Sequence, residues 1–180
     1  MSIQKFGRIV AFQLVFTLGL ANLAHAGNPA TISVTVTIQN LSVAASGPIA
    51  FGTVLAGSQT VSSSSSTVTN DGNIAETFSL SLTNPSTWTA VQLAPSSAEE
   101  YALLTQFSSS APAAGSFTFA NHSLSTTAAS SSATRFAGDQ TGVSVAASSS
   151  RSVWFRFNAP TSTAVTTQQN ITVTVTASAG

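Results

Sequence analysis

The sequence predicts an all-β protein, an antiparallel β-sandwich of about eight or nine strands. Several stretches alternate between apolar and hydroxyl side chains with a period of two, which is typical of half-buried antiparallel strands. Glycine, proline, asparagine and aspartate separate these stretches, as expected of turns. No stretch shows the 3.6-residue period of an amphipathic helix of normal length.

The first element is a secretory signal peptide over residues 1–26. Lys5 and Arg8 supply its positive region, residues 9–23 are apolar, and Ala24-His25-Ala26 fits a cleavage site. The apolar run is about 15 residues long, shorter than the ~20 that a membrane-spanning helix needs. We therefore expect export and cleavage, which leave residues 27–180 as one domain with no membrane span.

The two most regular strands are predicted at the ends of the exported chain, over residues 30–39 and 170–177. In each, isoleucine, valine or alanine alternates with threonine or serine, and β-branched residues favour extended backbone. Such a terminal strand either completes its own sheet or, in a polymerising protein, is donated to a neighbour, because an open sheet edge accepts an added strand.

Residues 67–89 form the centre of the predicted fold. Their inward-facing side chains, at alternate positions, are Phe78, Leu80 and Leu82. Asn70-Asp71-Gly72-Asn73 precedes them as a turn, and Pro85 follows, which has no N–H for a strand ladder. We expect a hairpin at the heart of the sandwich, followed by Trp88 as a core candidate.

The remaining elements follow from the same pattern. Strands are predicted at 49–54, 59–69, 116–120, 142–147 and 151–158. Across the serine run inside 59–69, strand pairing is favoured and a flexible excursion is the alternative. Residues 101–107 fit a helix or a strand. Residues 108–134 are rich in serine, threonine and alanine and are expected to be looser, with 124–134 as the best candidate for a mobile segment. The strand spacing fits an immunoglobulin-like sandwich or a jelly roll.

The segment 49–73 resembles a known family. It carries Ile49-Ala50-Phe51-Gly52-Thr53-Val54, then Gly57-Ser58, then Val68-Thr69-Asn70 and Gly72-Asn73. This pattern is similar to the opening of bacterial immunoglobulin-like domains of the Hydin and sperm-protein type. The resemblance implies an immunoglobulin-like sandwich used for protein contacts, with no catalytic residues.

Charge excludes several kinds of partner. The exported chain has three arginines, no lysine and five acidic residues, a net charge of −2. Without a basic stripe, it is not expected to bind nucleic acid or anionic lipid. A surface of low charge, rich in serine and threonine, fits either a subunit that packs against copies of itself or an ordinary extracellular module.

Catalytic and metal-binding chemistry has little support. His122, the one histidine of the exported chain, is expected to be a solvated loop residue, and nearby serines carry no specificity. Glu99 and Glu100 are adjacent and diverge, so they cannot act across one bond. The turns at 70–73 and 139–142 offer oxygen atoms but lack the acidic density of a calcium loop. We predict no enzyme, no cofactor and no metal site.

The candidate contact surface consists of Trp154, Arg156 and Trp88. On strand 151–158, Trp154 and Arg156 alternate with apolar residues and would face outward, although burial of both strand faces is the alternative. We predict a secreted, non-enzymatic structural or adhesion protein, extracellular, at the cell surface or in the periplasm. Its partners would be copies of itself in a surface layer or filament, or a surface protein or glycan. The alternative is a carbohydrate-binding module that uses the exposed aromatic residues.

Overall fold

The computed structural model describes residues 31–180, which belong to two units, residues 31–36 and residues 37–180. The predicted signal peptide, residues 1–26, lies outside the described residues. No helix between residues 31 and 180 has the length and apolar character needed to cross a bilayer.

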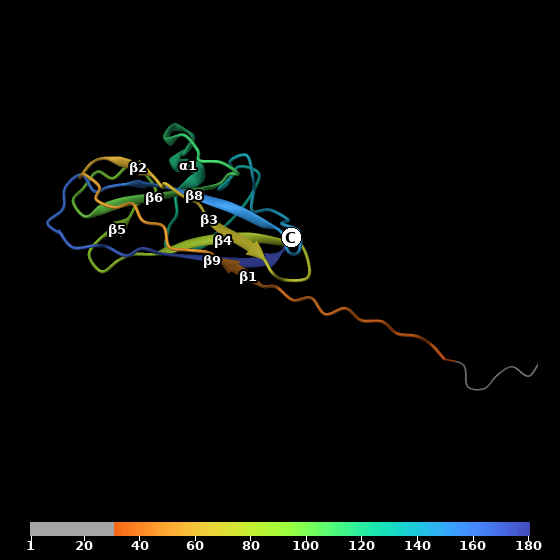
Figure 1. Cartoon of the computed structure of the whole chain (residues 1–180). Coiled ribbons are helices and arrows are strands. Elements are labelled where there is room, and N and C mark those ends of the chain that lie inside the picture. The colour runs from red at the N-terminus through yellow and green to blue at the C-terminus, as the bar shows by residue number, and fades with distance from the viewer. Residues whose placement is uncertain (1–30) are drawn as a thin grey trace, which may run out of the picture. The chain divides into compact units, whose positions relative to one another are not determined.

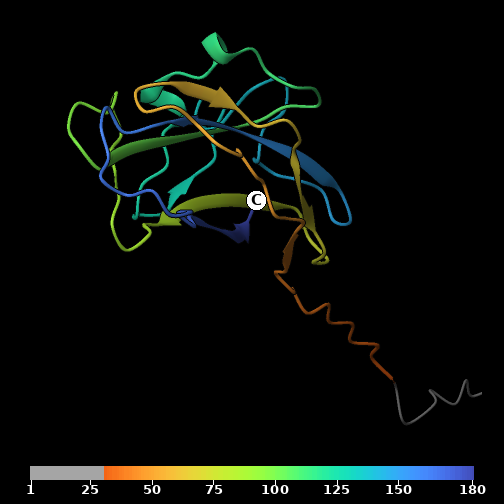
Figure 2. The same cartoon turned by 60° about the vertical axis from the view of Figure 1, so that its left-hand side comes forward.

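Residues 37–180 form two packed sheets, which confirms the predicted all-β sandwich (Figure 1). The larger sheet contains β1 (Val43–Ala45), β2 (Gln59–Val61), β3 (Ser66–Asn70), β5 (Thr89–Ala90), β6 (Glu100–Phe107) and β8 (Ser150–Asn158). The smaller sheet contains β4 (Glu76–Thr83), β7 (Ala129–Ser130) and β9 (Thr172–Ala179). Figure 2 shows β4 and β9 in one layer and β6 and β8 in the other.

Strand order follows from the pairing. The larger sheet runs β1-β3-β8-β6-β5, with β2 also paired to β8, and the smaller runs β7-β4-β9. All pairs are antiparallel except the short β5–β6 pair. The strand predicted at 59–69 is therefore real but broken, since β2 and β3 both pair with β8 on either side of the serine run. Residues 101–107, whose sequence fits either a helix or a strand, belong to strand β6.

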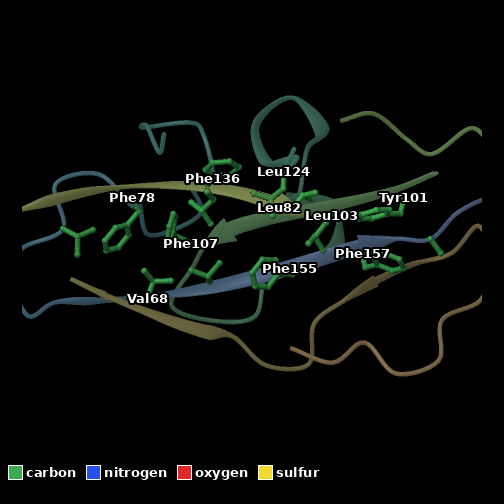
Figure 3. Close-up of a cluster of buried hydrophobic side chains, with 14 residues drawn as sticks. Val68, Phe78, Leu82, Tyr101, Leu103, Phe107, Leu124, Phe136, Phe155 and Phe157 are labelled. Carbon is green, nitrogen blue, oxygen red and sulfur yellow. The ribbon is translucent and has the colours of Figure 1, made fainter. Parts of the chain in front are cut away.

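The core lies between the two sheets. Phe78, Leu80 and Leu82 of β4 are buried, as their alternation predicts. They meet Leu103 and Phe107 of β6 and the inward side chains of β8, which are Val153, Phe155 and Phe157. Figure 3 shows this cluster between the sheets.

The predicted hairpin at the centre of the fold is wrong. β3 and β4 flank the expected turn, but β3 pairs with β1 and β8 while β4 pairs with β7 and β9. The connection is an arch between the sheets. The Asn70 side chain fixes it by donating to the carbonyls of Ile74 (2.7 Å) and Val145 (2.8 Å) and by accepting from the Gly72 N–H (2.9 Å).

Four predicted strands are absent from the described chain. Residues 31–39 belong to no strand, and residues 116–120 instead contribute to the 3-10 turn η1 (Ala114–Ser116) and the short helix α1 (Phe119–His122). In 142–147 only an isolated bridge forms, between Val145 and Glu76. Residues 49–54 are a loop, because Pro48 offers no N–H and Gly52 takes a positive φ of 66°.

Residues 108–134, expected to be the loosest part, divide between the two sheets, and residues 108–122 cover the outer face of the larger sheet. Phe117 packs there against Ala102 and Leu104 of β6, in a second and smaller apolar cluster. Farther along, Leu124 is fully buried in the main core, and β7 pairs with β4. The composition of this segment alone does not show that side chains such as Phe117 and Leu124 anchor it to the rest of the fold.

Candidate functional site

An apolar groove of about 870 Å³ opens between the edges of the two sheets. One wall is β9 and the residues before it, through Ile171, Val173 and Val175. The other wall is the loop at residues 45–56, and the floor consists of core side chains of β3, β4, β6 and β8. Among the described residues that line the groove, none is ionisable.

β9 is an edge strand whose inward side chains are incompletely buried. It pairs with β4 over all eight of its residues, with Leu80 opposite Val175 and Leu82 opposite Val173. The β4 leucines are 1–2% exposed, whereas both valines are only partly buried. The inward side chains of β4 are covered because β7 and β9 flank this strand. Within residues 31–180 β9 pairs on one side only, so its inward side chains stay partly exposed. Its second edge is free to accept a strand.

The loop at residues 45–56 forms a wall of the groove without forming a strand. Ile49, Phe51 and Val54 pack on the core, and the Phe51 ring lies 5.5 Å from that of Phe157. The glycine and proline residues of the loop interrupt backbone pairing while the apolar side chains still reach the interior. The sequence predicts a strand at these residues, and the structure places them in a loop.

Glu99 holds the loop before β9, which lines the groove across from residues 45–56. Its carboxylate accepts a hydrogen bond from the Thr163 hydroxyl (2.6 Å) and one from the Ala164 N–H (2.7 Å). The bond from Thr163 is the main reason that the pKa of Glu99 lies below its usual value. From the sequence Glu99 is only a catalytic candidate, whereas in the structure it holds the loop before β9.

The chain leading into β1 is held by the arch between β3 and β4. Asn73 donates from its side chain to the Ile38 carbonyl (2.7 Å) and accepts from the Asn40 N–H (2.8 Å). The Ser42 N–H donates to Glu76 Oε1 (2.8 Å). A Cβ on Gly72 would lie 2.4 Å from the Asn40 oxygen, so only glycine fits there. The chain is thus fixed from Ile38 onward.

Trp154 and Arg156 face away from the main core on β8, as their alternation predicts, and Arg156 fits the alternative in which both faces of the strand are buried. Arg156 is 5% exposed, since residues 108–122 cover this face of the sheet. Its guanidinium donates to the carbonyls of Ala114 (2.7 Å) and Phe117 (2.9 Å), and burial lowers its pKa. Trp154 is partly buried in the same cluster and donates to the Ser108 carbonyl (3.0 Å).

Trp88 lies on the other side of the larger sheet, where it lines the groove. Its ring stacks on Phe157 with centroids 5.9 Å apart, and its N–H donates to Thr163 (3.3 Å). The three residues of the predicted contact surface therefore do not form one surface. Trp88 belongs to the groove, and Trp154 and Arg156 belong to the covered outer face.

His122 is buried, which corrects the expectation of a solvated loop residue. Its Nδ1 accepts from the Thr118 N–H (2.8 Å), and its Nε2 lies 3.1 Å from the Ala137 carbonyl, to which it donates in the neutral form. Desolvation is the main cause that lowers its pKa below the usual value. Both ring nitrogens are therefore occupied by hydrogen bonds within the chain.

The acidic turn residues also bond to the chain itself. The Asp139 carboxylate accepts from the N–H (2.7 Å) and the hydroxyl of Ser109, and these bonds lower its pKa. In the part of the chain that the structure describes, no three histidine, aspartate or glutamate side chains cluster as metal ligands would.

No family model, curated protein or solved structure matches this chain. The resemblance over residues 49–73 therefore stays a prediction. The structural features that bear on function are the groove and its edges.

Proposed function

We propose that this protein is an exported, non-enzymatic structural subunit that self-assembles through the free edge of β9 and the groove beside it. The observation that carries the proposal is the contrast between the buried inward side chains of β4 and the half-buried inward side chains of β9. A sandwich that ends in an open, apolar edge is a site for strand addition.

The chemistry of the groove supports protein assembly over catalysis. Its lining offers no ionisable group for acid–base work and none to bind a charged ligand. The low charge of the exported chain fits a surface that becomes buried between subunits, because few charges would have to be desolvated.

Adhesion to a cell-surface protein or a glycan is the second form of this proposal. A carbohydrate-binding module has less support, since Trp88 and Trp154 lie on opposite faces of the larger sheet and cannot form one stacking platform. Export itself depends on the signal peptide predicted at residues 1–26.

The test is the size of the exported protein, measured by light scattering and negative-stain microscopy, for the wild type and two variants. Val173→Glu places a charge at the groove, and Thr174→Glu places the same charge on the solvent face of the same strand. We expect regular polymers for the wild type and Thr174→Glu, and monomers for Val173→Glu. Circular dichroism checks that each variant is folded. A wild type that stays monomeric at every concentration would overturn the proposal.

A further inference from the structure

We propose that the groove is occupied by residues 31–37 of a second copy, which add to β9 as a new strand. This inference depends on the proposed self-assembly and names the segment that drives it. We call residues 31–37 the N-terminal segment.

The N-terminal segment has the pattern of a strand but no strand partner. Ile32, Val34 and Val36 are 88%, 80% and 76% exposed. None of the hydrogen bonds found among the described residues involves residues 31–37. Three exposed β-branched side chains at alternate positions are unusual on a protein surface and mark a contact site.

The N-terminal segment and β9 match in number and spacing. The groove receives three inward side chains from the β9 side, at Ile171, Val173 and Val175. The segment offers three apolar side chains with the same period of two, so one strand can place all three in the groove. Its other face carries threonine and serine, which would lie beside the outward threonines of β9, and such cross-strand hydroxyl pairs stabilise a sheet.

Charge and direction also agree. The segment has no charged residue, and the lining of the groove has none. The smaller sheet is antiparallel throughout, so an antiparallel addition to β9 continues it.

The occupant is assigned to a second copy because of the hydrogen bonds at Ile38, Asn40 and Ser42. To enter its own groove, the chain would have to reverse between residue 37 and β1. Asn73 and Glu76 hold the backbone at each of these three positions, and a turn there would have to break these hydrogen bonds. A chain fixed at this point is free to extend toward another molecule.

Cysteine cross-linking tests the proposal, since the chain contains no cysteine. Thr174→Cys on the outward face of β9 is combined, in the full chain, with Ser33→Cys, Thr35→Cys or Thr37→Cys. The matched controls combine Thr174→Cys with Ile32→Cys, Val34→Cys or Val36→Cys. Outward positions of neighbouring strands come within disulfide range, while inward and outward positions lie on opposite faces of the sheet.

We expect a ladder of covalent oligomers on a non-reducing gel for at least one outward pair, at least tenfold stronger than for any control pair. Equal ladders in both series, or a cross-link within single chains, would overturn the second-copy strand. Light scattering on the same samples separates the two proposals. Polymers without a ladder would overturn the N-terminal segment as the occupant, and no polymers at all would overturn self-assembly.

Discussion

Two regions of this chain share one sequence pattern but differ in structure. Residues 31–37 and β9 both alternate β-branched apolar residues with threonine or serine. β9 pairs with β4 along its whole length, while the N-terminal segment pairs with nothing in the described chain. The pattern thus specifies that a segment forms one face of a sheet, but it does not specify which molecule supplies the sheet.

A second difference lies within the smaller sheet. β4 has a neighbour on each side and buries its inward side chains, whereas β9 has one neighbour and leaves its own half-buried. The half-buried strand β9 and the unpaired N-terminal segment are complementary, so a change to either one should alter assembly.

The largest effect is expected from charges on the apolar face of the N-terminal segment. Val34→Asp with Val36→Asp removes the burial of two valines, about 1.5–3 kcal/mol each, and places two charges in an apolar site. The concentration needed for assembly should rise by more than about 100-fold. Sedimentation of the exported protein over a concentration series measures this value.

The matched control is Thr35→Asp with Thr37→Asp, which adds the same charge to the hydroxyl face. Assembly by this variant should change by less than about tenfold, since exposed charges have weak effects. A loss of assembly equal to that of the valine variant would show that net charge, and not the buried face, controls assembly.

The next effect contrasts β4 with β9 through one cross-strand pair. Leu80→Ala should lower the free energy of unfolding of the monomer by about 3 kcal/mol, because the leucine is fully buried. Val175→Ala, directly opposite, should cost about 1 kcal/mol, because that valine is half-buried. Urea denaturation at low concentration measures both values.

In assembled material the cost of Val175→Ala should increase, while that of Leu80→Ala should stay the same. The added strand would bury the exposed part of the valine, whereas the leucine, although it also lines the groove, is already only 1% exposed. If the two costs kept their ratio after assembly, the groove beside β9 would not be the site of contact.

The fold class followed from the sequence because alternation is local and strong at 76–83, 151–158 and 170–177. The departures have physical causes that the alternation of side chains does not report. The strand at 49–54 was lost to the backbone constraints of Pro48 and Gly52, although its side chains still reach the core.

The candidate site was predicted only in part. Alternation places Arg156 outward but does not show that residues 108–122 fold over it, because the alternation at 116–120 predicts a strand there and not a cover anchored by Phe117. The groove itself was not predicted, since it depends on which strand ends the sheet. The one signal in the sequence was the pair of regular strands at the two ends of the chain.

The smallest effect is expected from His122, which lies away from the groove and serves as a test of independence. Burial lowers its pKa in the folded protein below the ~6.5 of the unfolded chain. Between those two values the unfolded state binds more protons, so the stability that neutral His122 supports is complete above about pH 6.5 and declines as the pH falls. His122→Gln should remove this decline in urea denaturation between about pH 5 and 7.5, where carboxylates change little.

Because α1 packs on the outer face of the larger sheet, the same variant should assemble as the wild type does. If His122→Gln changed assembly, the two faces of the larger sheet would be energetically coupled. The contact between the N-terminal segment and the groove beside β9 would then not account for assembly by itself.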